Sequence, residues 1–529
     1  MEISMDTFDV VIVGSGINSL VCAAMLVRRS KRVCVLERNA VAGGCIRTDE
    51  ITVPGFRHDL FSMSYPLFVM SPHYPLLKDG LEAGGLKFVS GGIPTGVVLP
   101  DGRSLVFSQS RDENVAVMNA LSPGDGDAYR AAMAGVEREA PLIFTALGQE
   151  PWSWPTGKIF LKELFRRGPR ELGAFFGEAM PTQRSWLERE FRSELVQALF
   201  APWVLHTGMG PDDAMSALMT KVIMFTLEAA GIPFVVGGSS RIVDAFRTLI
   251  ESNGSVIETD TDVTRVMVEN QKAVGVETRA GRRVAARQAV ICNVTPTQLY
   301  QRLLAAAAVP DRIAARARAF RYGRADMQIH VALSGPPAWH DPKLADVAVI
   351  HLTPGLDGVS RAVRDAEQGL LPTEGTIVVG QPAKADPSRC PSGQSLLWIQ
   401  LQELPRVVRG DAANEIAVPP SGAWTTALAE AYAQRVLTRL GRHLTNLDRA
   451  TIKTAVLSPA DLERHNINLV GGDPYSGACT LGQFHLWRPL PGSRNHRTAV
   501  SGLYHIGAST HPGAGLGGMS GYLAAQDIE

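Results

Sequence analysis

The stretch around Gly14-Ser15-Gly16 is where residue types and spacing most clearly suggest chemistry. Glycines at this spacing let the backbone turn tightly and approach a pyrophosphate. The free N–H groups of a helix starting beside them then favour its negative charge. Glu37 lies 21 residues after Gly16, where a carboxylate can accept hydrogen bonds from both hydroxyls of a ribose. Because that carboxylate repels a 2′-phosphate, we expect a dinucleotide without one.

Three elements must position these residues. Residues 8–13 are mostly β-branched, as in a strand buried on both faces, and residues 20–27 read as a packed helix. Residues 32–37 form a second strand that ends in the acid, which completes a βαβ unit. Ser19 stands at the third glycine position of the fingerprint. That position serves helix–strand packing, so we expect a slightly wider gap rather than lost binding.

A glycine pair, Gly43 and Gly44, follows the acid after a few residues. Nicotinamide domains do not need this pair, whereas FAD bound extended across the sheet passes close to this loop. Glycine permits that approach, and Arg47 can neutralise phosphate charge. The pattern therefore favours FAD.

This N-terminal pattern resembles the FAD-binding N-terminus of the amine oxidase/phytoene desaturase superfamily. Residues 54–59 resemble the segment that turns toward the flavin ring in that family, and residues 237–300 resemble its β-meander. Residues 458–463 and 471–491 look like the phytoene-dehydrogenase-like branch rather than the amine oxidases proper.

The C-terminal segment 502–521 reads as a short strand running into Gly507, then a glycine-rich loop and a short helix. Only eight residues follow Gly521, too few for a second strand and ribose acid, so a second nucleotide site is excluded. In the resembled family this helix points its N-terminus at the flavin N1/O2 edge. Its dipole would stabilise anionic reduced flavin there by roughly 0.3–2 kcal/mol.

The predicted βαβ unit and the family resemblance together assign a set of cofactor-binding positions. The resemblance implies that the backbone at Val263 contacts the adenine. They are Gly14, Ser15, Gly16, Ile17, Asn18, Ser19, Glu37, Arg38, Gly43, Gly44, Arg47, Val263, Gly507, Gly517, Gly518 and Met519.

Polar groups expected near the flavin are His58, Asp59 and His511. A histidine with a pKa near neutrality could serve as a catalytic base; alternatively, these residues hydrogen-bond cofactor or backbone. Cys45 could be reactive, but we expect a packed thiol. No cluster has convincing metal-ligand spacing, so we expect no metal.

The expected fold class is α/β (α+β overall), with a Rossmann-like FAD-binding domain carrying a β-meander. A discontinuous substrate domain of mixed sheet and helices accompanies it. The FAD-binding domain takes residues 1–75, 231–300 and 455–529, and the substrate domain residues 76–230 and 301–454. Helices are predicted over 188–200, 214–230, 242–251 and 425–440.

The inserted region 76–230 contains Trp152, Trp154, Trp186 and Trp203, for which we expect core packing or an apolar substrate wall. Within it, Lys158, Lys162, Arg166 and Arg170 recur at spacing four, opposite apolar residues. Such a helix is either an ordinary solvated helix or a peripheral membrane contact, and Gly168-Pro169 would interrupt it.

Composition excludes several classes. Lys+Arg and Asp+Glu are both 52, so the chain lacks the positive field of a nucleic-acid binder. Six scattered cysteines form neither a disulfide framework nor a CxxC pair. The N-terminus shows no secretory signal and no apolar run is long enough to span a bilayer, so we expect a cytoplasmic or membrane-peripheral protein.

These observations predict an FAD-dependent oxidoreductase that dehydrogenates an apolar or amphipathic organic substrate, with hydride transfer to flavin N5. The alternative within enzymes is an FAD-dependent amine oxidase, and outside them a non-catalytic flavoprotein carrier or assembly factor. Without a second dinucleotide fingerprint, we expect O2 or a quinone as electron acceptor. The sequence does not indicate an oligomeric state.

Overall fold

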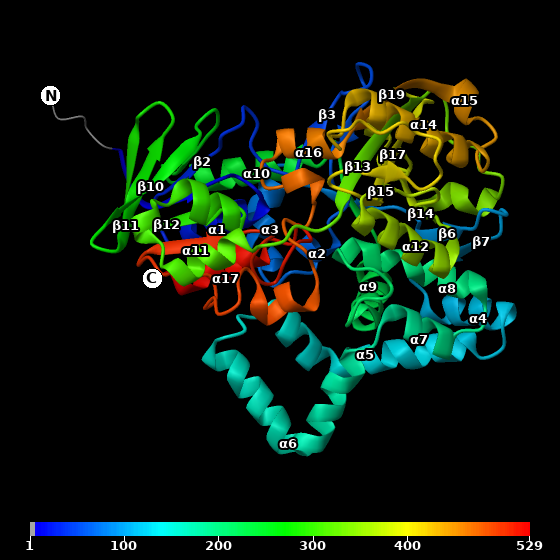
Figure 1. Cartoon of the computed structure of the whole chain (residues 1–529), viewed down its shortest axis with the longest axis horizontal. Coiled ribbons are helices and arrows are strands. Elements are labelled where there is room, and N and C mark those ends of the chain that lie inside the picture. Colours follow the sequence, from blue (N-terminus) through cyan, green and yellow to red (C-terminus); the bar gives the residue numbers. More distant parts are fainter. Residues whose placement is uncertain (1–5, 529) are drawn as a thin grey trace.

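Two seven-stranded sheets organise the chain in the computed structural model, which describes residues 6–528 (Figure 1). Residues 1–5, on which the expectation of no secretory signal partly rests, lie outside the described residues. Within the described range, no helix is long and apolar enough to cross a bilayer.

The first sheet has the strand order β10-β11-β12-β1-β2-β9, with β20 also paired to β12. Its parallel part comprises β1 (Asp6–Val13), β2 (Val33–Leu36), β9 (Val256–Glu258), the second half of β12 (Arg283–Asn293) and β20 (Leu503–Ile506). The carboxyl ends of these strands therefore meet at one edge of the sheet, the usual place for a ligand in such folds.

The β-meander is shorter than the sequence suggested. Residues 256–259 were expected within it, but β9 is a parallel strand beside β2. The meander consists of β10 (Val263–Glu269), β11 (Lys272–Thr278) and the first half of β12, which pairs with β11. The second half of β12 pairs with β20 instead, so the same edge of β12 pairs first with β11 and then with β20.

Three helices pack with the first sheet in one apolar cluster: α1 (Ile17–Val27), α10 (Ser240–Glu251) and α17 (Met519–Asp527). Helix α17 lies against the N-terminal end of α1. A Cβ at Gly521 would stand 1.8 Å from the carbonyl oxygen of Asn18, so only glycine allows this backbone contact.

The second sheet has the order β19-β13-β17-β16-β14-β6-β7. Its strands are β6 (Ile93–Val98), β7 (Ser104–Phe107), β13 (Ala325–Leu333), β14 (Val347–Leu352), β16 (Ile377–Gly380), β17 (Ser395–Leu404) and β19 (Thr451–Leu457). One face packs on α14 (Thr426–Gly441) through an apolar cluster. The predicted domain boundary at 454/455 falls inside β19, which pairs with β13.

The inserted region is helical, as predicted, but its details differ. It holds α4 (Arg111–Leu121), α5 (Asp125–Gly148), α6 (Trp154–Ala179), α7 (Gln183–Glu190), α8 (Glu194–Phe200) and α9 (Ser216–Ala230). The prediction of one helix over 188–200 is wrong, because the buried Asp125 carboxylate accepts hydrogen bonds from the N–H groups of Arg192 and Ser193. These bonds hold the chain extended between α7 and α8.

The four tryptophans separate into two kinds. Trp186 and Trp203 are buried in the core, whereas Trp152 and Trp154 are 56% and 68% exposed. The exposed pair adjoins α6, which projects from the body as a bent arm (Figure 1). Gly168 breaks this arm with non-helical backbone angles, at the point where the sequence suggested an interruption.

The remaining helices and strands are short or connect these layers. They are β3 (Thr48–Asp49), β4 (His58–Asp59), α2 (Pro66–Val69), α3 (Tyr74–Ala83), β5 (Phe88–Ser90), β8 (Pro233–Val235), α11 (Asp311–Arg318), α12 (Gly355–Gln368), β15 (Leu370–Leu371), α13 (Pro382–Ala385), β18 (Gly410–Asp411), α15 (Leu447–Ala450) and α16 (Pro459–His465).

Candidate cofactor and substrate site

The turn between β1 and α1 fits a pyrophosphate. Gly14 has a φ of +88°, which favours glycine, and a Cβ at Gly16 would stand 3.2 Å from the Asn293 side chain. Within the described residues, no side chain caps the N-terminus of α1 at Gly16. The first N–H groups of the helix, which include those of Ile17 and Asn18, are thus available to a negatively charged ligand.

Ser15 joins the turn to both neighbouring loops. Its hydroxyl donates to Glu37 Oε2 at 2.6 Å and accepts from the N–H of Gly43 at 2.8 Å. The N–H of Ser15 also donates to Glu37 Oε2, and the N–H of Asn39 donates to Oε1. The acid predicted to bind ribose is therefore held at the end of β2, beside the phosphate turn.

The glycine pair lies directly on this turn. A Cβ at Gly44, whose φ is +60°, would stand 3.1 Å from the Cα of Gly16. Nearby, Arg47 forms an ion pair with Asp49 at 3.0 Å, and Arg38 is exposed. We call the turn at Gly14 and Gly16 together with the loop at Gly43 and Gly44 the cradle. Its glycines have no side chains, which leaves room for FAD to pass close to the backbone.

Asn293, at the end of β12, is a residue that the sequence analysis missed. Its Nδ2 donates to the Ser19 hydroxyl at 2.9 Å, and its backbone oxygen would be 3.1 Å from a Cβ at Gly14. On its other side, a Cβ at Gly507 would stand 2.5 Å from Asn293 Oδ1. Its position at the carboxyl end of a predicted strand was the available signal.

The C-terminal loop meets the same edge. The N–H of Gly507 donates to the hydroxyl of Ser520, at the start of α17. Gly518 is the N-cap of α17 with a φ of +76° and has no side chain with which to cap the helix. Asn18 Oδ1 accepts from the N–H of Gly521 at 3.2 Å, which leaves the N–H groups of Met519 and Ser520 available at the edge where Gly14 and Asn293 lie.

Two predicted cofactor residues, Val263 and Gly517, and the thiol of Cys45 lie at the sides of this arrangement. Val263 starts β10, two residues after Thr261, whose N–H donates to the backbone oxygen of Glu37. Gly517 packs on Leu67 of α2. The Cys45 thiol accepts from Asn466, and burial raises its pKa to about 11, so it stays protonated near neutrality.

The carboxylate of Asp59, a predicted catalytic residue, has three partners within the protein. Its carboxylate forms a fully buried ion pair with Arg389. It also accepts from the Thr48 hydroxyl at 2.6 Å and from the N–H of Ser239 at 2.8 Å. Nothing in the sequence pointed to Arg389, which lies 330 residues away.

The two predicted catalytic histidines are buried and neutral. Burial lowers the pKa of His58 to about 4 and that of His511 to about 3. The Nε2 of His58 lies 2.8 Å from the Thr52 hydroxyl, and its ring meets the His330 ring edge-on at 5.2 Å. Among the described residues, His58 Nδ1 has no hydrogen-bond partner.

Polar side chains continue from His330 along the face of the second sheet that lies opposite α14. Asp326, Gln328 and His330 alternate along β13, with Gln400 and Trp398 opposite them on β17. Gln400 donates to Asp326 at 2.6 Å, and burial raises the pKa of Asp326 to about 8. At the near end, the Trp398 indole donates to the backbone oxygen of Phe61, close to β4.

The same buried face extends through Gln402. Its Nε2 donates to the Tyr475 hydroxyl at 3.0 Å and lies 3.5 Å from His206, which contacts His351. Burial lowers the pKa of His206 to about 4 and holds that of His351 well below its usual range. We call the buried and half-buried polar residues of this face the chamber lining: His206, Asp326, Gln328, His330, His351, Gln400, Gln402 and Tyr475.

The chamber lining is uncharged near neutral pH, since its histidines are deprotonated and Asp326 is protonated. Several buried polar atoms near it have no hydrogen-bond partner within residues 6–528. They are Gln328 Oε1, Gln402 Oε1, Trp203 Nε1 and Arg324 Nε. Buried groups of this kind are normally satisfied, so they are available to water or a bound molecule.

Comparison with protein families decides the assignment. The family described as flavin containing amine oxidoreductase matches residues 20–529. The chain belongs to this family. It is accordingly an FAD-dependent oxidoreductase, and the glycine-shaped cradle fits that cofactor.

Relatives within this family align over nearly the whole chain. Pyridine nucleotide-disulfide oxidoreductase domain-containing protein 2 of Rattus norvegicus is 26% identical, covering 98% of this chain and 93% of that protein. A component of the limonene dehydrogenase of Castellaniella defragrans is 24% identical, with 98% and 94% covered. The neurosporene-forming phytoene desaturase of Cereibacter sphaeroides is 23% identical, with 96% and 92% covered. The predicted phytoene desaturase-like branch is confirmed.

Solved structures support the same fold. An oxidoreductase from Methanosarcina mazei superposes with a TM-score of 0.61 at 17% identity, covering 98% of this chain and 99% of that one. Cyclohexylamine oxidase from Brevibacterium oxydans superposes with a TM-score of 0.58 at 15% identity, covering 98% and 97%. The predicted fold class is thus confirmed, and the family match confirms the predicted cofactor.

Proposed function

We propose that this oxidoreductase dehydrogenates an uncharged carbon of an amphipathic organic substrate. Bound FAD supplies the acceptor for the hydride at its N5. The protein must then hold the substrate against the cofactor, keep water out and receive the proton that leaves the neighbouring carbon.

The observation that carries this proposal is the uncharged chamber lining. An ammonium substrate would need a carboxylate or an aromatic cage to replace its water shell. Here the one carboxyl group of the lining, Asp326, is protonated, because burial raises its pKa to about 8. Such a lining suits a carbon skeleton with hydroxyl or carbonyl groups better than an amine.

The lining residues have separate tasks in this proposal. Gln328 and Gln402 each present a buried amide oxygen that has no partner within residues 6–528, so they can orient substrate hydroxyl groups. Asp326 is held by Gln400 and can donate its proton to a carbonyl oxygen. His58 offers its free Nδ1 as the proton acceptor, and its low pKa makes it a weak base that releases the proton readily.

The names of two relatives agree with oxidation of carbon rather than nitrogen. One is called part of a limonene dehydrogenase and another a phytoene desaturase, and both align over 96% or more of this chain. A putrescine oxidase and the cyclohexylamine oxidase share the fold at 14% and 15% identity.

The deciding experiment mixes FAD-loaded protein anaerobically with terpenes, polyenes, long-chain alcohols or primary amines and records the visible flavin band. Bleaching by one of the uncharged substrates, with the unsaturated or oxidised product found by mass spectrometry, is the expected result. Bleaching by amines alone refutes the proposal in favour of an amine oxidase. A flavin that stays oxidised with every class points to the non-catalytic carrier instead.

The electron acceptor in this proposal is O2 or a quinone. The test mixes substrate-reduced protein with air-saturated buffer or with a soluble quinone and follows the return of the visible band. The acceptor is the one that restores the band at least as fast as steady-state turnover. A rate far below turnover with both contradicts this part of the proposal.

We also propose that the α6 arm contacts a membrane surface from the cytoplasmic side. Phe165 is 85% exposed near the bend of the arm, and Trp154 is 68% exposed at its base. Lys162 and Arg170 are exposed on the same arm. Exposed aromatics beside cations suit an anionic bilayer.

Flotation with phosphatidylserine vesicles tests this contact. We expect Phe165→Ser to reduce the bound fraction severalfold. The matched control is Val407→Ser, because Val407 is a 57% exposed apolar residue outside α6. Equal flotation of both variants and the parent protein contradicts a membrane role for the arm.

A further inference from the structure

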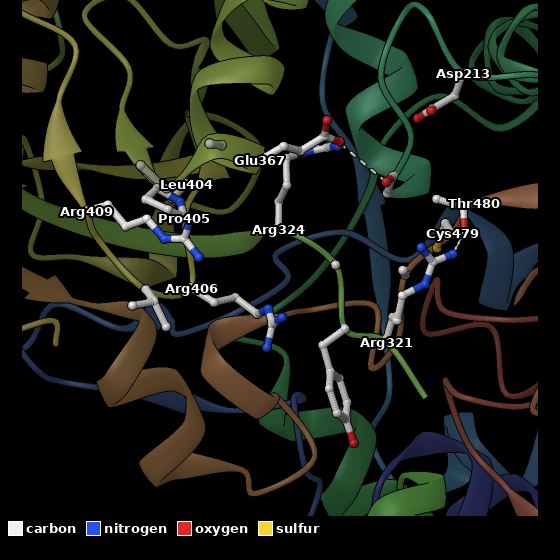
Figure 2. A pocket seen from close by; sticks show the side chains of 17 residues that line it. Asp213, Arg321, Arg324, Glu367, Leu404, Pro405, Arg406, Arg409, Cys479 and Thr480 are labelled. Carbon is white, nitrogen blue, oxygen red and sulfur yellow. Dashed lines mark hydrogen bonds and ion pairs between the residues drawn. The ribbon is translucent and has the colours of Figure 1, made fainter. Parts of the chain in front are cut away.

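A cleft rich in arginine opens at the outer end of the β13–β17 strand pair. Its volume is about 340 Å³, and four arginines line it: Arg321, Arg324, Arg406 and Arg409 (Figure 2). Two acids, Asp213 and Glu367, also line it, so formal positive charge exceeds negative charge by two. Figure 2 shows Arg406 and Arg409 on one side and Arg321 on the other.

Among residues 6–528, one of these four arginines forms an ion pair with a carboxylate. Arg324 forms an ion pair with Glu367 at 3.3 Å, whereas Arg321, Arg406 and Arg409 form none with the described residues. Arg321 donates to the Thr480 hydroxyl, and Arg406 lies over the Tyr322 ring at 5.9 Å. Like charges gathered at one cleft repel one another, so this arrangement favours an anionic ligand.

Arg324 connects the cleft with the protein interior. Its side chain is only 10% exposed and donates to the backbone oxygens of Gly208 and Met209. Its Nε is buried and has no partner within residues 6–528. A buried N–H group without an acceptor is unfavourable, and an acceptor atom of a ligand in the cleft would satisfy it.

The chamber lining begins where the cleft ends. Arg324 precedes β13, and Asp326 and Gln328 follow on the same strand, while Leu404 ends β17 after Gln402. From Arg324 to His330 the strand covers about 20 Å, at about 3.3 Å per residue. The cleft walls also include apolar residues, namely Leu404, Pro405, Val407 and Ala478.

We propose that this cleft binds the anionic headgroup of the substrate, a carboxylate or a phosphate monoester, while its uncharged part extends along the chamber lining. Arg321 and Arg406 would hold the anion at the mouth, and Arg324 Nε would donate to it further in. The placement of the substrate's reacting part along the chamber lining rests on the proposed function, whereas the anion site does not depend on it. Guanidinium groups suit both headgroups, because their donors match two oxygens at once.

Calorimetric titration of the FAD-loaded protein with octanoate, octyl phosphate and octanol tests this site. We expect at least one anion to bind at least tenfold more tightly than octanol, and 500 mM salt to weaken that binding. Arg406→Ala should weaken anion binding about tenfold, since one charge-assisted hydrogen bond contributes roughly that much. The tighter anion identifies the headgroup.

The matched control is Arg449→Ala, because Arg449 is exposed, lies on α15 away from the cleft lining and forms no ion pair with described residues. It removes the same charge and should leave octanoate binding unchanged. Octanol binding as tightly as both anions, or equal losses in R406A and R449A, overturns the proposal. Because Arg406 is exposed, R406A should retain the melting temperature of the parent protein.

The results also separate this inference from the proposed function. Loss of anion binding in R406A without turnover of any uncharged substrate supports the site and contradicts the dehydrogenase. Turnover of a neutral terpene at an unchanged kcat/KM in R406A, with no anion binding, supports the dehydrogenase and overturns the site.

Discussion

Arg389→Met should destabilise the protein strongly, because it leaves the Asp59 carboxylate buried without its cation. Both side chains are 1% exposed. Arg389 also donates to the backbone oxygens of Arg57 and Val235, so its removal leaves further acceptors unsatisfied. Breaking a buried ion pair on one side typically costs about 3–5 kcal/mol.

The assay is urea unfolding of the FAD-loaded protein, followed by circular dichroism at equal protein concentration. We expect a loss of about 3–5 kcal/mol for R389M and a similar loss for Asp59→Asn, which strands the guanidinium instead. The double variant should be more stable than either single variant, because it leaves no buried charge without its partner. A loss below about 1 kcal/mol in R389M refutes the reasoning.

The same variants separate a structural role of Asp59 from a catalytic one. If Asp59 only holds Thr48 and Ser239 beside the cradle, D59N molecules that retain flavin should turn over at a rate near that of the parent protein. If the sequence-based assignment of Asp59 as a catalytic residue is right, kcat per bound flavin should fall at least a hundredfold.

Three further predictions concern the cradle and the chamber. Gly44→Ala should weaken FAD binding at least tenfold in a fluorescence titration, because its Cβ would press on the phosphate turn, whereas the control Gly85→Ala, also at positive φ but in open space, should bind normally. Equal affinities in the two variants contradict this account of the cradle. Gly521→Ala should lower the melting temperature by several degrees relative to the same control, since its Cβ would overlap the Asn18 carbonyl and overpacking costs about 1–3 kcal/mol or more. An unchanged melting temperature shows that α17 does not depend on this contact. Asp326→Asn should flatten the pH dependence of stability. In the parent protein the pKa of Asp326 is about 8 when folded and 3.8 when unfolded, so only the unfolded chain loses the proton between these values. The unfolding free energy of the parent protein should therefore fall as pH rises, by about 1.4 kcal/mol per pH unit. Urea midpoints at pH 5 and pH 8 measure this, and identical slopes in variant and parent protein contradict it.

Local patterns predicted much of the first domain. The strand 8–13, the helix 242–251 and the glycine turn are encoded by neighbouring residues, so β1, α10 and the cradle were predictable within a residue or two. Helix 425–440 was predicted equally well, because its apolar period is local. These elements need no distant partner to be recognised.

Elements fixed by distant contacts were not predictable. The break between α7 and α8 depends on Asp125, which lies 67 and 68 residues before the N–H groups that it binds. Likewise, β9 looked like a meander strand until its pairing with β2 was seen. In the site, Asn293 bonds Ser19 and Arg389 pairs with Asp59, and each of these partners is more than 270 residues away.

The divided edge of β12 has a consequence for biosynthesis. Residues 283–285 find their partner β11 within the same hairpin, but residues 290–293 must wait for β20, more than 200 residues later in translation. Until then the nascent chain carries an unpaired apolar strand edge, a template for aggregation. A ribosome stalled before residue 503 would therefore present a species that needs chaperone protection, and flavin capture would be among the last events of maturation.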